Sequence, residues 1–228
     1  MWIVSAGLGL VRAEQPVPGY DLTLSEQSSD SIQARVQGGF DQALWWQQIQ
    51  RGPFAHPVSA LETALSDSGR VLIALTKPYV RMVGPILAAL PADQIAKLRF
   101  FGGGIEKVLP KILHAQVMRY DERLDQIVPG IKLDGAARAL EHFVSLVAKR
   151  TEGTAEQDQT LIDAALSGIA RSASVKREPI GDDELKALMV PWRAHGLSFS
   201  QALRRLRDVE LRSAEERRFR RIYSQVTP

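Results

Sequence analysis

The strongest structural signal in the chain is the stretch Arg70-Val71-Leu72-Ile73-Ala74-Leu75-Thr76. Five consecutive apolar residues lie at its centre, and Gly69 and Pro78 stand on either side. A short apolar run between residues that interrupt regular structure is typical of a buried strand. We therefore expect a strand here, and the neighbouring segments are interpreted from it.

The segments that follow this strand alternate between helical and extended patterns. A helix is expected over 79–90, interrupted by Pro85, and a second strand over 97–101. The triplet Gly102-Gly103-Gly104 closes that strand, and a helical pattern follows over 105–120. Strands that alternate with helices predict an α/β fold with a small, partly parallel sheet flanked by helices.

Further elements are expected on both sides of this region. A short apolar run near the N-terminus, bounded by glycine, predicts a strand over 2–6. Leu44 is expected on one side of a helix with Trp45 and Ile49, and Val144 is expected to face inward from another helix. Together these elements predict an α/β domain over 1–175. The additional helices are expected over 40–50, 59–65, 136–150 and 155–173.

The composition excludes several classes of protein. The chain has 228 residues, of which 45% are apolar, and it contains no cysteine. It therefore has no disulfide, no thiol nucleophile and no cysteine-bound zinc or iron–sulfur cluster. No apolar run approaches the ~18 residues of a membrane span, and the first residues lack the basic start of a signal peptide. We expect a cytoplasmic protein that does not contact a membrane.

Charge is distributed unevenly along the chain. The formal net charge is +3, yet residues 199–228 hold eight arginines and only four acidic residues. Residues 1–198 are therefore close to neutral, and the excess positive charge is arginine at the C-terminal end. We expect a basic helical module over 176–228.

This module contains three short helical patterns. Their predicted starts are Asp182, Ser198 and Ser213, since short polar side chains favour the first position of a helix. Pro191 is expected to break the first helix. Ser213 and Glu216 have the form of a capping box, in which each side chain bonds the backbone of the other residue.

The second and third of these helices carry arginines that are expected to face outward. Two short helices joined by a tight turn, with the second one basic, are typical of a helix-turn-helix-like module. Guanidinium groups suit contacts with phosphate and guanine. The pattern predicts a nucleic-acid partner, DNA more than RNA, and an acidic protein partner or a solvated helix face is the alternative. The candidate contact residues are Arg204, Arg205, Arg217, Arg218, Arg220 and Arg221.

A loop with two glycines follows the first predicted strand. In Ser5-Ala6-Gly7-Leu8-Gly9-Leu10, small residues would let a ligand approach the backbone at Ser5, Gly7 and Gly9. The third glycine of the dinucleotide-binding fingerprint is missing. A plain turn at the end of a strand is the alternative interpretation.

Together with a later segment, this loop resembles a known family. Ser5-Ala6, Gly9-Leu10 and then Gly19-Tyr20-Asp21-Leu22-Thr23-Leu24 are similar to a signature of the YaaA-like superfamily. That resemblance implies an α/β fold linked to DNA binding and the oxidative stress response, among relatives that accompany base-modification and phage-defence genes. It also implies that Ser5, Gly9, Tyr20 and Asp21 lie near a ligand. The family usually has an earlier strand, whereas this motif begins at residue 2.

Two further groups could bind or react. The triplet at 102–104 lies between a predicted strand and a predicted helix, where free backbone N–H groups favour an anion such as phosphate, and a tight turn is the alternative. Asp121 and Asp125 belong to a cluster of carboxylates and arginines over 119–125. They are the candidate catalytic acid and base, and a solvated set of ion pairs is the alternative.

The sequence indicates no metal site and no particular cofactor. The four histidines, His56, His114, His142 and His195, have none of the close spacings of a zinc site. The Walker motif of nucleotide-binding loops and the Gly-x-Ser-x-Gly motif of serine hydrolases are also missing. The hypothesis is a nucleic-acid-associated protein of DNA modification or phage defence that binds or acts on a base or nucleotide. The alternatives are a small-molecule enzyme of nucleotide or modified-base metabolism and a non-enzymatic subunit of a multiprotein defence complex.

Overall fold

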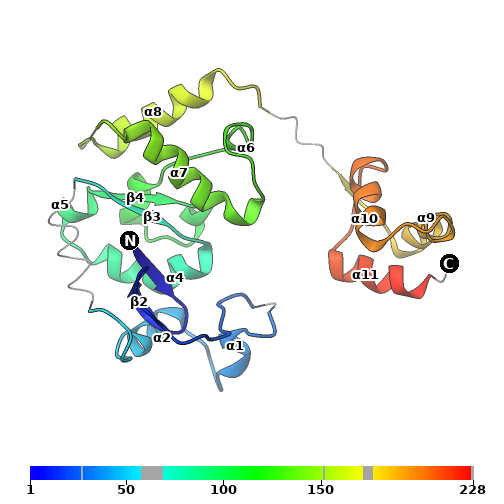
Figure 1. The fold of residues 1–228 in the computed structure, drawn as a ribbon, viewed down its shortest axis with the longest axis horizontal. Helices are drawn as coiled ribbons and strands as arrows, with labels where there is room; N and C mark the ends of the chain where they lie inside the picture. Colours follow the sequence, from blue (N-terminus) through cyan, green and yellow to red (C-terminus); the bar gives the residue numbers. More distant parts are fainter. Residues whose placement is uncertain (27, 58–68, 151, 172–176, 227–228) are drawn as a thin grey trace. The chain divides into compact units, whose positions relative to one another are not determined.

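The structure is a computed structural model that describes residues 1–26, 28–57, 69–150, 152–171 and 177–226 (Figure 1). The chain divides into two compact units, Met1–Arg171 and Ser172–Pro228. The domain boundary predicted at 175 and the helix predicted over 59–65 lie outside the described residues. None of the described helices is long and apolar enough to cross a membrane.

The first unit is a small α/β arrangement, as the sequence predicts. Its strands are β1 (Trp2–Ser5), β2 (Gly9–Arg12), β3 (Val71–Ala74) and β4 (Leu98–Phe101). Its described α-helices are α1 (Ile32–Arg35), α2 (Gln42–Ile49), α4 (Lys77–Ala88), α5 (Ala92–Ile95), α6 (Leu124–Ile127), α7 (Gly135–Val147) and α8 (Ala155–Ser167). Three 3₁₀ turns complete it, η1 (Ile105–Lys107), η2 (Lys111–Gln116) and η3 (Lys132–Asp134).

The strands form two separate pairs. β1 and β2 are an antiparallel hairpin in which Trp2 lies opposite Arg12. β3 and β4 are parallel, with Val71 opposite Leu98, so the predicted parallel pairing is confirmed. Two isolated bridges are also described, one from Phe100 of β4 to Val117 and one from Thr23 to Ser31. The first strand therefore pairs with the segment that directly follows it in sequence.

Strand β4 lies between two apolar cores. Its side chains alternate between the two faces, as in any strand, and all four residues are buried. Leu98 and Phe100 belong to the core that includes α4, whereas Phe101 belongs to the core formed with α7 and α8. Figure 1 shows α7 on one side of the β3–β4 pair and α4 on the other.

The helix predicted over 105–120 is wrong. The segment forms the two 3₁₀ turns η1 and η2, and Pro110 stands directly before the second turn. Proline has no N–H to donate and obstructs the preceding helical turn, so a continuous α-helix would be broken there. The chain instead returns to the sheet, where the backbone N–H of Met118 bonds the carbonyl of Phe100 at 2.9 Å.

Leu44 is exposed, and so is Val144, which was predicted to face inward. Leu44 is 59% exposed on α2, where Trp46 is the buried residue. Val144 is 45% exposed on α7, while Phe143 beside it is fully buried. Helix α4 also continues past Pro85, which lies on the exposed side of the helix.

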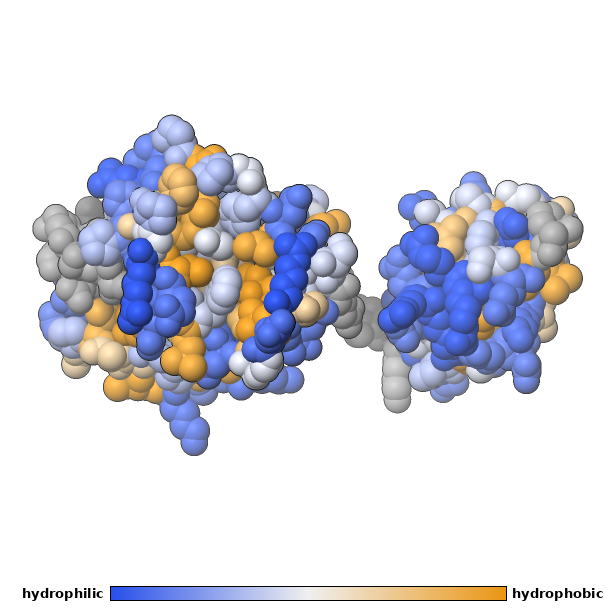
Figure 2. All heavy atoms as spheres, turned by 90° about the horizontal axis from the view of Figure 1, so that it is seen from below, coloured by the Kyte–Doolittle hydropathy of each residue, from blue (hydrophilic) through white to orange (hydrophobic). Residues whose placement is uncertain are grey.

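The second unit is a small helical body with its own core. It contains β5 (Glu178–Pro179), α9 (Asp182–Ala194), α10 (Phe199–Asp208), β6 (Arg212–Ser213) and α11 (Glu216–Gln225). Trp192, Leu206, Phe219 and Ile222 are among its buried core residues. Figure 2 shows mainly hydrophilic residues on the visible face of this unit and more apolar residues on that of the first unit.

The capping predictions for this unit have mixed outcomes. Ser198 and Gln201 form a capping box at α10, so that predicted start is confirmed. The predicted start at Ser213 is wrong, because Ser213 lies in β6 and its hydroxyl donates to the carbonyl of Arg177. Pro191 does not end α9, which continues to Ala194 with Pro191 on an exposed face.

Candidate functional site

The loop after β1 is held by Ser5. Its Oγ accepts hydrogen bonds from the backbone N–H groups of Gly7 at 3.3 Å and Leu8 at 3.0 Å. The same hydroxyl is hydrogen-bonded to the hydroxyl of Tyr20. A Cβ added at Gly7 would lie 3.1 Å from the Tyr20 ring. The structure thus brings together three of the predicted site residues, Ser5, Gly7 and Tyr20.

Gly9 and Asp21 have other surroundings. Gly9 has a φ of +80°, in the left-handed region that favours glycine, and a Cβ there would clash with the Gln50 side chain. Gly9 is therefore needed for the close approach of α2 to the hairpin. Asp21 is exposed, and its backbone carbonyl accepts a hydrogen bond from Arg35 at 3.3 Å.

The glycine triplet after β4 does not precede a long helix. It leads into the three-residue turn η1, which is too short to have the anion-binding N-terminus that was expected there. Gly102 is covered, since a Cβ would lie 2.4 Å from the carbonyl oxygen of Leu75. Gly103 faces open space, and Gly104 has a φ of +64° beside Lys77.

The two candidate acid–base residues are both engaged in ion pairs. Asp121 contacts Arg123 at 2.8 Å and Arg171 at 3.3 Å. The hydrogen bond from Arg123 holds the pKa of the Asp121 carboxyl below its usual value, so Asp121 is ionised at neutral pH. Asp125 is half-exposed and pairs with Arg138 at 2.8 Å. This geometry makes Asp121 an acceptor and leaves it no proton to donate at neutral pH.

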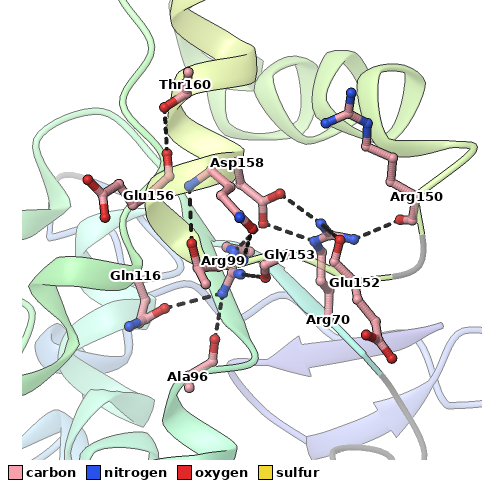
Figure 3. A network of polar contacts seen from close by, with 12 residues as sticks. Arg70, Ala96, Arg99, Gln116, Arg150, Glu152, Gly153, Glu156, Asp158 and Thr160 are labelled. Carbon is pink, nitrogen blue, oxygen red and sulfur yellow. Dashed lines mark hydrogen bonds and ion pairs between the residues drawn. The ribbon is translucent and has the colours of Figure 1, made fainter.

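A buried network of three charged residues links α8 to β4 and to the start of β3 (Figure 3). Asp158 at the start of α8 is fully buried, and its two carboxylate oxygens contact Arg99 at 2.6 Å and Arg70 at 2.8 Å. Arg99 is also fully buried, within β4. The other N–H groups of the two guanidiniums donate to Gln116 and to backbone carbonyls of residues 96, 98, 150, 152 and 153.

This network ties the sheet to the segment before α8. The sequence interpretation missed it, because its members are up to 88 residues apart in the chain. One signal was present, since Arg99 interrupts an otherwise apolar strand at a position that faces the interior. A charged residue there requires a buried partner.

A cavity of about 750 Å³, lined by both apolar and charged residues, opens beside the network. Gln116 and Gly153 belong to both. Charged side chains of both signs line it, among them Arg119, Glu152 and Glu156. The cavity therefore does not favour one sign of ligand charge.

A second cavity, of about 580 Å³, is almost wholly apolar. Trp2 and Val4 of the hairpin, Trp46 of α2 and residues 71–76 along β3 are among those that line it. Tyr79 stands at this cavity, and its pKa is raised by burial and by the nearby Tyr20. None of Ser5, Gly102 and Asp121 lines either of these two cavities.

A tyrosine–histidine pair joins the half-buried Tyr120 to the buried His142 of α7. The Tyr120 hydroxyl and Nδ1 of His142 are hydrogen-bonded at 3.1 Å. Burial raises the pKa of Tyr120 and lowers the pKa of His142. Both side chains are therefore neutral at physiological pH.

Four of the six candidate arginines in the second unit have acidic partners. Arg218 and Arg221 contact Asp182 at 2.7 and 2.9 Å. Arg220 contacts Glu216 at 3.2 Å, and Arg205 contacts Glu210 at 3.7 Å.

The remaining two candidates, Arg204 and Arg217, are exposed and have no acidic partner among the described residues. Exposed Arg207 shares this property.

Within the described ranges, no group of three or more histidine, aspartate or glutamate side chains is placed to hold a metal ion. The candidate site is therefore best described as two regions, the Ser5–Tyr20 loop of the first unit and the exposed arginines of the second. Comparison with known proteins returned no matching family model, curated protein or solved structure.

Proposed function

We propose that the chain is a nucleic-acid-associated protein whose second unit contacts the phosphate backbone, of DNA in preference to RNA. The observation that carries this proposal is the set Arg204, Arg207 and Arg217, which is exposed and lacks acidic partners among the described residues. Unpaired guanidiniums are free to neutralise phosphates.

The surrounding contacts support this role for the helices. The guanidinium of Arg205 lies over the Trp192 ring, and that of Arg220 lies over the Phe199 ring. Arg218 and Arg221 fasten α11 to the first turn of α9 through Asp182. The paired arginines thus stabilise the small core and orient the helices, which leaves phosphate contact to the unpaired ones.

The resemblance to the YaaA-like superfamily supports a place in DNA modification or phage defence. In that setting the first unit binds or acts on a base or nucleotide. The Ser5–Tyr20 loop is the proposed contact region, because a serine and a tyrosine hydroxyl converge there beside Gly7.

The test is fluorescence anisotropy with labelled duplex DNA, measured at several salt concentrations. Each phosphate contact adds about 0.9 to the slope of log Kd against log salt. The triple variant Arg204→Glu, Arg207→Glu, Arg217→Glu is expected to bind more weakly and to lower that slope by roughly 2 to 3.

A matched variant controls for total charge. Arg51, Arg81 and Lys149 are exposed residues of the first unit, and their replacement by glutamate changes the net charge by the same amount. This control is expected to keep most of the affinity. Equal loss in both variants, or no binding at low salt, would contradict the proposal. If the chain binds an acidic protein but no DNA, and the triple variant loses that protein, the result would favour a subunit of a protein complex instead.

A further inference from the structure

The outer edges of two of the four described strands in the first unit are covered by other parts of the chain. Beside β2, the backbone N–H of Leu10 donates to Gln50 at 2.7 Å and its carbonyl accepts from the N–H of His56 at 2.7 Å. Beside β4, Phe100 pairs with Val117. A covered edge has no backbone groups left for another strand.

The outer edges of β1 and β3 have no such cover in the described residues. On β3, the N–H groups of Val71 and Leu75 bond Lys97 and Phe101, so those of Leu72 and Ala74 point away from β4. On β1, the N–H of Ala13 bonds the carbonyl of Met1, so every second residue counted from Met1 directs its backbone groups toward β2.

The backbone groups of Trp2 and Val4 consequently point away from β2. Both uncovered edges therefore present alternating donors and acceptors.

These two uncovered edges line one cavity. Trp2 and Val4 stand on its wall together with Leu72 and Ala74, and its volume is about 580 Å³. No lysine, arginine, histidine, aspartate or glutamate is among the residues that line it. Trp46, also on the wall, is only 3% exposed, and its indole N–H has no hydrogen-bond partner among the described residues.

We propose that this cavity is a strand-acceptor site, which takes one extended, uncharged segment of a partner protein between β1 and β3. Donors and acceptors alternate along both edges, and another polypeptide backbone carries them at the same spacing. The apolar wall selects apolar side chains, such as valine and isoleucine, that favour extended backbone. β1 and β3 have four residues each, which matches an inserted segment of about 13 Å.

The proposal is tested with a synthetic hexapeptide, blocked at both ends. Its four central residues, alternating valine and isoleucine, form the uncharged segment that pairs with the four-residue strands, and a lysine at each end lies outside that segment and keeps the peptide soluble. Binding to the full-length chain is measured by calorimetry and by tryptophan fluorescence, since Trp2 and Trp46 line the cavity. Two control peptides carry N-methyl groups on alternate backbone amides, one peptide for each edge of the strand. The side chains of both control peptides are those of the parent hexapeptide, so only backbone hydrogen bonds are removed.

We expect one hexapeptide to bind per chain, and each N-methylated peptide to bind at least about tenfold more weakly. Val4→Pro and Ala74→Pro remove one outward N–H each and are expected to weaken binding similarly, because proline is tolerated at a strand edge. Thermal unfolding of each variant checks that it is folded. The N-methylated peptides test the same backbone hydrogen bonds without altering the protein.

Several results would overturn the proposal. Equal binding of the N-methylated peptides would make the site a purely apolar pocket, and loss with only one of them would exclude pairing with both edges. Failure of the unmodified peptide to bind would also contradict it. A dimer in solution that Val4→Pro converts to monomer would identify a second copy of this chain as the occupant instead.

Discussion

Asp158 neutralises two buried arginines in the first unit, Arg70 and Arg99. It is fully buried and is the only acidic contact of both Arg70 and Arg99 among the described residues. A buried carboxylate between two guanidiniums compensates charges that would otherwise be isolated from water. Its removal leaves two cations in the interior with carbonyl groups alone as partners.

We therefore expect Asp158→Asn to lower the free energy of unfolding by about 3 kcal/mol or more. Asp121→Asn is the matched control, since it removes a carboxylate whose arginine partners are partly or largely exposed. The control is expected to cost less than about 1 kcal/mol. Urea denaturation of both variants makes the comparison, and equal losses would show that the network contributes no more than a surface ion pair.

Two neighbouring glycines after β4, Gly102 and Gly103, are expected to differ in how much they contribute to stability. Gly102→Ala places a methyl group 2.4 Å from the Leu75 carbonyl oxygen, so we expect a loss of about 1–3 kcal/mol of stability. Gly103→Ala meets open space and is expected to change stability by less than about 0.5 kcal/mol. Thermal denaturation tests both, and a tolerated Gly102→Ala would contradict the close approach of these strand ends.

His142 gives the chain a pH dependence of predictable sign. Burial lowers its pKa below the ordinary value of 6.5, so the unfolded chain takes up a proton at a higher pH than the folded one. The contribution is complete above pH 6.5 and is lost as pH falls through the lower folded pKa.

We expect the unfolding free energy of the parent to fall between pH 7.5 and about 5.5, and that of His142→Asn to fall less. His195→Asn, at an exposed position, serves as the control. A parent whose stability is unchanged over this range would contradict the prediction.

At the scale of elements, the contribution of the observed helix cap at Ser198 of α10 can be compared with that of Ser213, which the sequence predicted as the cap of α11. Ser198→Ala removes a capping box and is expected to cost about 1 kcal/mol. Ser213→Ala removes one exposed hydroxyl bond from β6 and is expected to cost less. Chemical denaturation, followed by Trp192 fluorescence in a chain whose other tryptophans are replaced by phenylalanine, distinguishes the two. A larger loss at Ser213 would contradict the structure.

The sequence predicted the elements that local pattern determines. The apolar runs that became β3 and β4 are bounded by glycine or proline, and Ser198 has its capping partner three residues away. The 3₁₀ turns around Pro110 were missed, because the long helical pattern of apolar residues there continues through a residue that breaks the helix.

The candidate site was less predictable. Ser5 and Tyr20 do lie together, but the Asp158 network and the two uncovered strand edges depend on contacts between distant parts of the chain. In the second unit, which arginines are neutralised depends on Asp182, 36 and 39 residues before its partners. Residue type alone does not indicate such pairing.

At the scale of the whole molecule, the two units have separate cores. Phe143 is fully buried in the first unit and Phe219 in the second. We expect calorimetry to resolve two unfolding transitions, since each unit buries its own apolar cluster. Phe219→Ala is expected to destabilise one transition by about 3–5 kcal/mol and Phe143→Ala the other. If both variants shift the same transition, the units do not unfold independently.

The position of β4 has a consequence for how the first unit folds. Because its alternate side chains belong to both cores, we expect both cores to close only as β4 pairs with β3. That pairing joins residues distant in sequence, so we expect it to be slower than closure of the local β1–β2 hairpin. The β3–β4 pairing is then the expected common rate-limiting step. The two clusters of the first unit should accordingly appear and disappear together in a single kinetic phase.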